Sequence, residues 1–413
     1  MLLGRYFFCG ETIMTMDNNL SHKTGIEDYY TIKNNKKMRF GYTTGTCAAA
    51  AAKGACSILL SEPGTGPAER DGCMSLITPK GIELCLKLVD IDKGPDYVSC
   101  GVVKDAGDDP DVTHGLTVYA RVSKTETPGI SIRGGKGVGT VTKKGLEQPV
   151  GNPAINRVPR LMIEEGIREI CEMTGYEGGI QVTVSVPGGE ETALKTFNPR
   201  LGIEGGISIL GTSGIVEPMS ETALIKSIET EINQQLANGR HNLIVTLGNY
   251  GKAYLEELDR LPMKDSVKCS NYIGEVIDMA VAGGAEGLLF VAHLGKFVKV
   301  AGGIMNTHSR CADSRMEIMA SAALKAGLGR EGALRLLEAP TTDEGVSILK
   351  EYGLLEETMK NLMDKISFYL SNRAYGRIPV EALVFSNEYG YLGETAGCRK
   401  LIETIKGETN NEG

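Results

Sequence analysis

Residues 39–55 read RFGYTTGTCAAAAAKGA, a threonine–glycine turn that leads directly into five alanines. Ala has the highest helix propensity and Thr is a common N-cap residue, so we expect a helix that begins at the turn, residues 43–46, and ends near Leu60. The N–H groups and the dipole of a helix start favour a bound anion. The alternative is that the small side chains serve only to let this helix pack closely against a sheet.

Beyond this helix the chain shows strand-like alternation, with apolar residues at every second position. The alternating segments are residues 82–88, 116–122 and 180–186, and a helical pattern covers residues 159–174. A chain of 413 residues is long enough for two or three domains. We therefore predict a strand-rich α+β domain over residues 36–200. Residues 1–35 are polar and are expected to form a poorly ordered N-terminal extension outside the fold.

After residue 200 the pattern changes to short apolar runs that alternate with helical stretches. The runs are GGISILG (205–211), NLIVTLG (242–248), GLLFVAH (287–293) and EALVFSN (381–387). Such runs, each followed by a helix, are typical of a mostly parallel sheet. We predict a Rossmann-like α/β domain with C-terminal helices over residues 201–413. Ligands of such sheets bind beyond the carboxyl ends of the strands, which selects residues 211–214, 248–251 and 292–295.

The composition excludes several classes of protein. The formal net charge is −8 and no dense stripe of Lys and Arg is present, so we expect no nucleic-acid partner. The ten cysteines are scattered without metal-ligand spacing, which is typical of reduced thiols in a cytoplasmic protein. The opening residues MLLGRYFFCGETIM lack the regions of a signal peptide, and no later stretch is apolar enough to span a membrane.

The segment KDAGDDPDVTHG, residues 104–115, concentrates carboxylates and one histidine in a loop between two strands. We name Asp105, Asp108 and His114 as candidate catalytic residues, because acid–base work needs such groups close together. Three interpretations stay open: a metal site, a solvated acidic turn, or a polar site whose like charges raise the pKa of one carboxyl group. The spacing does not match a calcium loop, so we predict no metal.

Two glycine-rich segments could bring backbone close to a ligand. RGGKGVGTVTKKG, residues 133–145, fails the phosphate-loop pattern but places Arg133 and Lys136 beside alternating glycines. LGTSGIVEPMSE, residues 210–221, offers Gly211 and Gly214 for a nucleotide-type turn, and the Glu217 carboxylate as an acceptor for ribose hydroxyls. The alternatives are a flexible hairpin and a tight strand–helix turn, respectively.

A third segment, HLGKFVKVAGGIMNTHSRCADSR (293–315), gathers basic and imidazole groups. His293 and His308 are too far apart to suggest a metal site without a third ligand, so we expect hydrogen bonding or proton transfer from them. Arg310 suits a carboxylate. The alternative is that its arginines form ion pairs with Asp313 and Glu317.

Several of these segments together resemble the CbiD family, cobalt-precorrin-5B C1-methyltransferases of anaerobic cobalamin biosynthesis. They are GYTTGTCAAAAAKGA, KDAGDDPDVTHG, GGKGVGTV, NPAINRVPRLMI, FNPRLGIEGGISILGTSGIVEPMS, GNYG and HLGKFVKVAGGIMNTHSR, spread over about residues 38–386. The resemblance implies an enzyme that moves the methyl group of S-adenosylmethionine to C-1 of a tetrapyrrole. Cobalt then belongs to the substrate, and no protein nucleophile is needed.

With that resemblance, the candidate residues receive expected roles. The cofactor set is Gly211, Thr212, Gly214, Glu217 and Asn249. The set for the substrate's carboxylates is Arg39, Thr43, Thr44, Lys136, Arg200, His293, His308 and Arg310. The aspartate loop would adjust a proton on the macrocycle. Two other functions stay open, an ATP-dependent phosphotransferase and a non-catalytic tetrapyrrole carrier, and we expect a homo-oligomer or contacts with other enzymes of the pathway.

Overall fold

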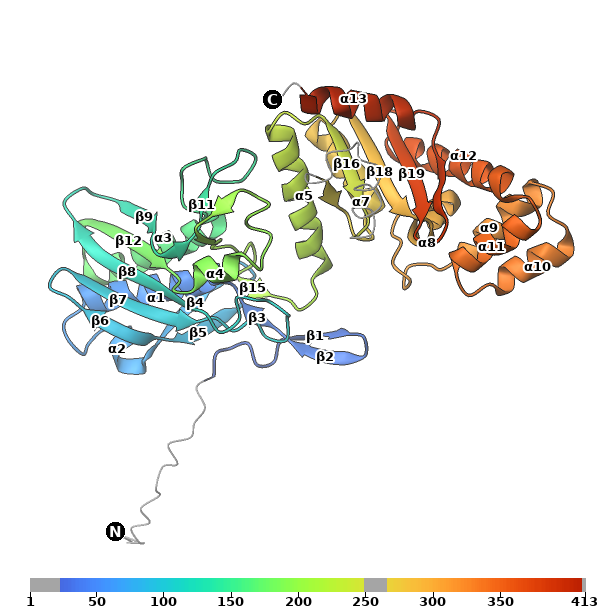
Figure 1. The fold of residues 1–413 in the computed structure, drawn as a ribbon. Helices are drawn as coiled ribbons and strands as arrows, with labels where there is room; N and C mark the ends of the chain where they lie inside the picture. Colours follow the sequence, from blue (N-terminus) through green and yellow to red (C-terminus); the bar gives the residue numbers. More distant parts are fainter. Residues whose placement is uncertain (1–22, 249–265, 411–413) are drawn as a thin grey trace, which may run out of the picture. The chain divides into compact units, whose positions relative to one another are not determined.

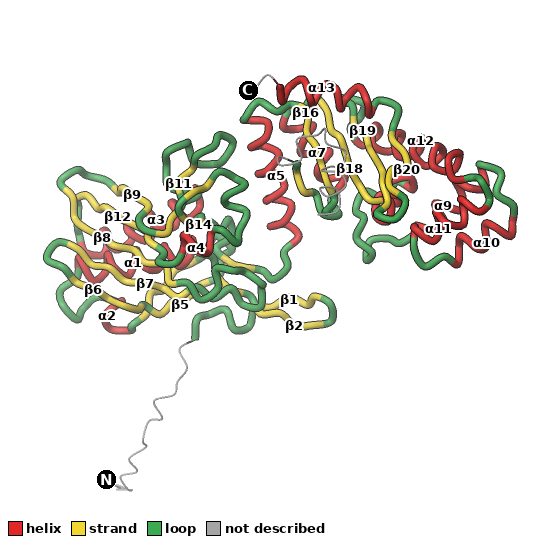
Figure 2. Tube along the Cα trace, viewed as in Figure 1, coloured by secondary structure: helices red, strands yellow, loops and turns green. Residues whose placement is uncertain are grey.

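The computed structural model describes residues 23–248 and 266–410, and the chain divides into two compact units (Figure 1). The first unit comprises residues 1–138, 155–192 and 208–218, and the second comprises residues 139–154, 193–207 and 219–413. Helices and strands are mixed in both units, so the chain is a mixed α/β protein (Figure 2). The domain boundaries at residues 35 and 200 remain predictions.

The first unit is built around α1 (Thr44–Leu60), the helix predicted from the alanine run. Thr43 is its N-cap, and the Thr46 N–H donates to the Thr43 hydroxyl at 3.2 Å. The helix lies beside α3 (Arg157–Thr174) and against the main sheet of this unit. Its alanines are almost fully buried, so the close-packing interpretation of the small residues is confirmed.

The main sheet of the first unit has five strands, and only β12 and β9 are parallel neighbours. In spatial order they are β6 (Val89–Lys93), β7 (Tyr97–Val103), β8 (Thr117–Thr125), β12 (Gly179–Ser185) and β9 (Ile130–Gly134). Val118, Ala120 and Val122 are fully buried, as their alternation predicts. The alternation at 116–122 and 180–186 therefore identified β8 and β12 and the face that they bury, whereas β6, β7 and β9 were not predicted.

Shorter elements complete this unit. They are β1 (Tyr30–Lys33), β2 (Lys36–Arg39), β3 (Gly41–Tyr42), α2 (Pro67–Asp71), β4 (Cys73–Ile77), β5 (Glu83–Lys87), β10 (Gly137–Val138), α4 (Gly189–Ala193) and β15 (Ile215–Val216). Ile26 is only 1% exposed, and the Cys85 N–H donates to the Thr24 carbonyl at 3.0 Å. Residues 23–35, assigned to the extension, therefore include segments that pair and pack within the unit.

The second unit contains a sheet of five strands, of which the first four are parallel and β20 is antiparallel. In spatial order they are β17 (Val267–Lys268), β16 (Asn242–Thr246), β18 (Gly287–His293), β19 (Val380–Ser386) and β20 (Gly390–Glu394). The apolar runs at 242–248, 287–293 and 381–387 are thus confirmed as parallel neighbours. The helical stretch expected after the run at 242–248, over about residues 250–261, lies outside the described residues.

Helices cover both faces of this sheet (Figure 1). One face packs against α5 (Glu221–Ala237), α7 (Ile273–Gly283), α9 (Arg315–Lys325) and α12 (Leu355–Arg373). The other face packs against α13 (Cys398–Asn410). The remaining elements are β11 (Thr140–Val141), β13 (Ile203–Glu204), β14 (Gly206–Ile207), α8 (Leu294–Phe297), η2 (Val298–Gly302), α10 (Arg330–Glu338) and α11 (Thr342–Glu351). Burial on both faces explains why the strands are continuously apolar.

One predicted strand of the parallel sheet is wrong. The run at 205–211 contributes only the two-residue β14, and residues 208–218 belong to the first unit, where β15 pairs with β3. Ile207 and Ile209 are 1% and 0% exposed. A short apolar run predicts burial, and an irregular buried segment satisfies that pattern as well as a strand does.

The prediction that every cysteine is a reduced thiol is also wrong. Cys73 and Cys85 form a disulfide, with their Cα atoms 5.9 Å apart. The cysteines lie on the paired strands β4 and β5, where Cys85 is opposite Ser75. Pairing of the strands brings together two residues that are 12 positions apart, a proximity that the spacing alone does not reveal. Within the part of the chain that the structure describes, no helix has the length and apolar character to cross a bilayer.

Candidate functional site

Segments far apart in the sequence meet at the N-terminus of α1 in the first unit. The Tyr42 N–H donates to the Asp105 carbonyl at 2.8 Å, and the Thr43 N–H donates to the Gly214 carbonyl at 3.1 Å. The Asn156 N–H donates to the Ile209 carbonyl at 3.0 Å. The turn at 43–46, the aspartate loop and the segment 208–218 therefore form one connected region, which we call the α1 site.

Arg39 and the aspartate loop form a close ion pair in this region. The Arg39 guanidinium donates to both Asp105 carboxylate oxygens, at 2.7 and 3.0 Å. The Gly107 N–H also donates to Asp105, at 2.8 Å. Asp108 accepts a hydrogen bond from the Arg39 backbone N–H at 2.6 Å. The bidentate fork of Arg39, predicted to bind a substrate carboxylate, is thus already used by Asp105.

Two carboxylates of this loop, Asp105 and Asp111, have lowered pKa values that favour the ionised form. Partial burial raises the pKa of Asp105, but the hydrogen bonds from Arg39 and Gly107 outweigh it and leave that pKa lowered. Burial also raises the pKa of Asp111. The charge of Lys104 and the hydrogen bonds from Lys104 and Thr113 outweigh this effect, so the pKa of Asp111 is lowered. The interpretation that like charges raise a carboxyl pKa is therefore wrong for Asp105 and Asp111.

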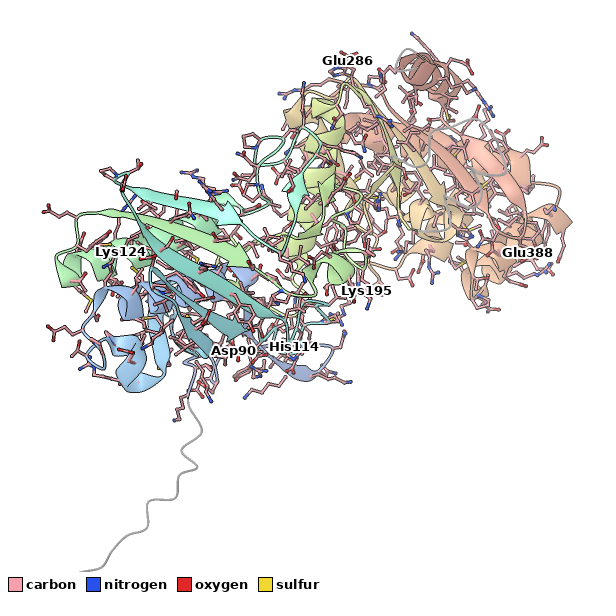
Figure 3. The ribbon with its side chains drawn as sticks, turned by 60° about the vertical axis from the view of Figure 1, so that its left-hand side comes forward. Asp90, His114, Lys124, Lys195, Glu286 and Glu388 are labelled. Carbon is pink, nitrogen blue, oxygen red and sulfur yellow. A yellow bond between two sulfur atoms is a disulfide. The ribbon has the colours of Figure 1, made fainter. Side chains whose placement is uncertain are left out.

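His114 is an exposed titratable group of the aspartate loop (Figure 3), which lies between β7 and β8. Its Nδ1 accepts a hydrogen bond from the Ala106 N–H at 3.1 Å, and lies 3.8 Å from an Asp105 oxygen. A neutral imidazole that accepts at Nδ1 carries its proton on Nε2. Asp105, Asp108 and His114 are thus brought together as predicted, with Arg39 between the two aspartates.

Several donors of the turn before α1 form hydrogen bonds within the protein itself. The Gly45 N–H donates to the Leu210 carbonyl at 3.1 Å, and the Thr44 hydroxyl accepts from the Leu210 N–H at 3.0 Å. Thr43 and Thr44 are 6% and 3% exposed. The expectation that this turn offers its N–H and hydroxyl groups to a carboxylate is therefore not supported, and Thr43 and Thr44 instead fix segment 208–218.

Neighbouring atoms occupy the space beside both glycines of LGTSGIVEP, Gly211 and Gly214. Gly211 and Gly214 adopt φ of +140° and +76°. A Cβ at Gly211 would overlap the Thr43 side chain, and one at Gly214 would lie 2.9 Å from the Thr78 Cβ. Glu217 is paired with Lys80. Gly211, Gly214 and Glu217 are thus in contact with other described residues of the protein, and Asn249 lies outside the described residues, so the cofactor set stays a prediction.

A Gly214→Ala variant is accordingly expected to lose stability rather than only ligand binding. Backbone strain and overpacking together predict a decrease of about 2–4 kcal/mol in the free energy of unfolding. Gly188→Ala is the matched control, because Gly188 has φ of +81° and no atom within 4 Å of an added Cβ. We expect its loss to be about 1–2 kcal/mol. Equal losses in urea unfolding would contradict the packing role of Gly214.

The sequence matches the CbiD family over residues 31–218 and the CbiD C-terminal domain over residues 306–396. The cobalt-precorrin-5B C(1)-methyltransferase of Ruminiclostridium cellulolyticum is 48% identical, and the match covers 92% of this chain and 99% of that protein. The chain belongs to the CbiD family. The enzyme of the same name from Alkaliphilus metalliredigens is 44% identical over 92% of this chain and 98% of its own. A crystal structure of the cobalamin biosynthesis protein cbiD from Archaeoglobus fulgidus is 28% identical with a TM-score of 0.37, covering 69% of this chain and 87% of that chain.

In this CbiD-family chain, the remaining predicted substrate residues have varied surroundings. Lys136 is exposed beside Gly137, whose added Cβ would overlap the Val186 carbonyl. Arg200, in the second unit, donates to the Ser266 carbonyl at 3.1 Å and lies 3.7 Å from Glu231. The alternating glycines near Lys136 thus permit close packing of the chain on itself, and Arg200 already has a carboxylate neighbour.

His308 and Arg310 lie together on an exposed loop of the second unit. The Arg310 backbone N–H donates to His308 Nδ1 at 3.1 Å. The loop is held by the buried Lys299, whose Nζ donates to the carbonyls of Thr307 and Ala312 at 3.2 and 2.7 Å. The structure therefore gives Lys299 a supporting role that the sequence pattern did not indicate.

His293 lies where β18 ends, at the carboxyl edge of the parallel sheet. Its Nδ1 accepts a hydrogen bond from the Gly295 N–H at 3.0 Å, and its ring contacts Phe385 edge to face at 5.7 Å. Burial lowers the pKa of His293, and the nearby Asp343 partly offsets this. The imidazole is therefore neutral at pH 7, and its Nε2 carries the proton.

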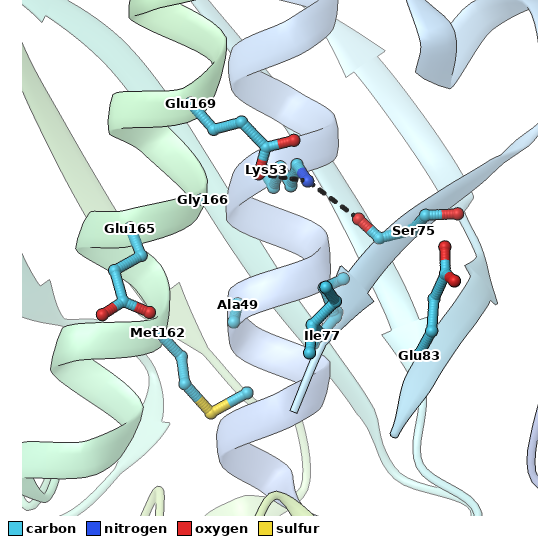
Figure 4. A pocket seen from close by; sticks show the side chains of 10 residues that line it. Ala49, Lys53, Ser75, Ile77, Glu83, Met162, Glu165, Gly166 and Glu169 are labelled. Carbon is cyan, nitrogen blue, oxygen red and sulfur yellow. Dashed lines mark hydrogen bonds and ion pairs between the residues drawn. The ribbon is translucent and has the colours of Figure 1, made fainter. Parts of the chain in front are cut away.

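A cavity of about 270 Å³ lies between α1, α3 and strands β4 and β5 (Figure 4). Lys53, 7% exposed, donates to Glu169 at 2.7 Å and to the Ser75 carbonyl at 2.9 Å. The pair joins α1 to α3, which explains a lysine within an otherwise apolar helix. Its two charges neutralise each other, so we assign Lys53 a structural role. Among the described residues, no cluster of His, Cys, Asp and Glu is arranged to hold a metal ion.

Proposed function

We propose that this chain transfers the methyl group of S-adenosylmethionine to C-1 of cobalt-precorrin-5B in anaerobic cobalamin biosynthesis. The observation that carries the proposal is the 48% identity with a cobalt-precorrin-5B C(1)-methyltransferase across 92% of this chain. Methyl transfer to a ring carbon needs alignment of two ligands and exclusion of water, and it needs no protein nucleophile. Cobalt enters as part of the substrate.

The α1 site is the proposed place of the macrocycle. The ionised Asp105 is fixed by Arg39, so it supplies a constant negative charge rather than a transferable proton. His114 is exposed enough to reach a ligand and lies 3.8 Å from an Asp105 oxygen, and an imidazole can both donate and accept a proton. We therefore assign proton adjustment on the macrocycle to His114, and orientation of the loop to Asp105 and Asp108.

The methyl donor is proposed to bind at the carboxyl edge of the parallel sheet in the second unit. In the sheet, β17 lies on one side of β16, whereas the next strands along the chain, β18 and β19, lie on the other side. The direction in which strands are added to the sheet therefore reverses between β16 and β18. Such a reversal point is where parallel α/β sheets bind ligands. Gly248, just beyond β16, lies at this edge and is the residue that we propose to approach the donor.

The test of the function is a direct assay. Purified protein is incubated with cobalt-precorrin-5B and S-adenosylmethionine, and the product is examined by mass spectrometry and by NMR with a labelled methyl group. The expected result is addition of one methyl group at C-1, with stoichiometric S-adenosylhomocysteine. Tight tetrapyrrole binding without methyl transfer would overturn the proposal in favour of a carrier, and ATP consumption would favour a phosphotransferase.

Asp108→Asn separates an orienting role from a catalytic one. An amide oxygen still accepts the Arg39 N–H that Asp108 binds at 2.6 Å, so the fold should be retained. If the negative charge helps the transition state, kcat should fall about tenfold with little change in KM. Asp108→Ala is the comparison, because it also removes the acceptor. Equal changes in kcat and KM for Asp108→Asn would mark the residue as a binding residue.

Some broader features are proposed with the function. We propose a Rossmann-like arrangement for the second half, on the basis of its four parallel strands. We also propose a cytoplasmic location. The free cysteines among the described residues fit it, namely Cys47, Cys56, Cys100, Cys171, Cys269, Cys311 and Cys398. A homo-oligomer or contacts with other enzymes of the pathway remain part of the proposal.

A further inference from the structure

The hairpin of β1 and β2 carries surface features that the roles above do not use. Its strands pair from Tyr30 opposite Arg39 to Lys33 opposite Lys36. The turn residues Asn34 and Asn35 have φ of 52° and 59°, the backbone of a two-residue hairpin turn that matches strand twist. The segment is thus a defined hairpin rather than an irregular extension.

The hairpin exposes both charge and apolar surface. Tyr30 and Ile32 are 47% and 68% exposed. Lys33 and Lys36 lie directly opposite each other, and like charges in that position are destabilising. Residues 29–40 contain no Asp or Glu that could neutralise them. A two-stranded hairpin is only marginally stable by itself. An anionic, partly apolar ligand would offset the repulsion between the lysines and cover the exposed apolar side chains.

One face of the hairpin combines these properties. Alternation places Tyr30, Ile32, Lys37 and Arg39 on the same face, and the Lys37 Nζ lies 3.8 Å from the centre of the Tyr30 ring. A flat apolar surface with cations at its edge suits a planar ring that carries carboxylates on its periphery. Tetrapyrrole substrates with acetate and propionate arms have this chemistry.

The base of the hairpin is fixed to the α1 site. Arg39 holds Asp105 through its guanidinium and Asp108 through its backbone N–H. The Phe40 N–H donates to the Tyr29 carbonyl at 3.0 Å, and the two rings stack with centroids 6.5 Å apart. The exposed face therefore continues directly from the loop that bears His114.

We propose that this hairpin is an arm that binds the tetrapyrrole. Tyr30 and Ile32 contact its ring, Lys37 on the same face receives one carboxylate, and Lys33 and Lys36, which alternate to the other face and flank the turn at the tip, receive carboxylates that reach past the edge of the hairpin. The inference rests on the proposed function for the identity of the ligand. An acidic protein surface is disfavoured as the occupant, because the hairpin begins at the candidate site itself. The charge-assisted contacts are exposed, so their contribution should weaken with added salt.

The test uses the full-length protein and two corrinoid probes in titration calorimetry. Cobyrinic acid carries free carboxylates on its acetate and propionate arms, and cobinamide carries amides there. The variant Lys33→Gln, Lys36→Gln, Lys37→Gln should bind cobyrinic acid at least tenfold more weakly than the unmodified chain. Binding of cobinamide should change less than twofold. The corresponding triple Arg variant keeps the charge and should restore binding of cobyrinic acid.

A matched charge control is Lys325→Gln, Lys360→Gln, Lys365→Gln, three exposed lysines of the second unit. It should leave both affinities unchanged. Equal affinities of the hairpin variant and the unmodified chain for cobyrinic acid would overturn the inference, and so would no binding of cobyrinic acid by the unmodified chain. Failure of the methylation assay alone would overturn the proposed function, since the calorimetric comparison involves no methyl transfer.

Discussion

A Lys104→Met variant is expected to lose about 3–5 kcal/mol of unfolding free energy, because it leaves a partly buried carboxylate without its charged partner. The Lys104 side chain is 2% exposed, and its Nζ lies 2.6 Å from an Asp111 oxygen. Asp111 also accepts hydrogen bonds from the N–H and the hydroxyl of Thr113. The pair thus fixes the loop that carries Asp105 and His114. Urea unfolding followed by circular dichroism measures the loss.

The stability contributed by the Lys104–Asp111 pair is expected to fall at acidic pH. The pKa of Asp111 is lowered in the folded protein, so its contribution to stability is present above the unfolded pKa of about 4 and is lost as the pH falls through the folded value. Without Lys104 the lowering weakens, and the variant should lose less additional stability on acidification than the unmodified chain. An identical acid dependence in both proteins would contradict the assignment.

Two controls separate burial from charge. Lys80→Met removes an ion pair with Glu217 that is substantially exposed, and it should cost less than about 1 kcal/mol. Lys104→Met combined with Asp111→Leu removes both charges, and it should recover part of the stability lost by Lys104→Met alone. A double variant less stable than the single one would show that the Thr113 hydrogen bonds matter more than the unpaired charge.

The elements predicted best were those whose signals are local. The alanine run and the Thr43 cap specify α1 without reference to the rest of the chain. The strands at 242–248 and 287–293 are long apolar runs with glycine or histidine at their ends, and few other structures bury every side chain of such a run. By contrast, residues 205–211 are apolar over a shorter stretch, which a buried irregular segment accommodates equally well.

The sequence located the acidic residues of the aspartate loop but did not reveal the ion-pair partners that set their pKa values. The density of acids at 105–111 is a local feature, whereas the partner of Asp105 is Arg39, 66 positions away. Repulsion among the acids was therefore the expected source of pKa shifts, and ion pairing with Arg39 and Lys104 proves to be the larger effect. The Arg39 pair depends on a contact between segments far apart in the chain, which single-sequence patterns do not specify.

The hairpin at 30–39 was missed although a signal was present. Its composition is polar, so the segment was assigned to an extension. The alternation of Tyr30 and Ile32 followed by Asn34-Asn35 is nevertheless a hairpin pattern, because asparagine tolerates the positive φ that the turn needs. The polar composition of residues 1–35 outweighed the hairpin pattern, which occupies only residues 30–39.

Replacing Gly248 with Val is expected to weaken binding of S-adenosylhomocysteine about a hundredfold, equivalent to about 2.7 kcal/mol. Gly248 follows β16 at the point where strand order reverses, beside β18 and its terminal His293. The backbone of Gly248 is outside the left-handed region, and no described atom lies within 4 Å of an added Cβ. Among the described residues nothing obstructs the added side chain, which would lie at the edge where we propose that the donor binds.

The measurement is titration calorimetry with S-adenosylhomocysteine, which requires neither the tetrapyrrole nor turnover. Gly407→Val in α13 is the matched control, because an added Cβ there also has no atom within 4 Å and the residue lies on an exposed part of its helix. It should bind like the unmodified chain. A folded Gly248→Val protein with undiminished affinity would exclude this edge of the sheet as the donor site. We expect a loss of affinity confined to Gly248→Val, with unchanged thermal unfolding in both variants, because the added side chain would lie at the edge of the sheet where we propose that the donor binds.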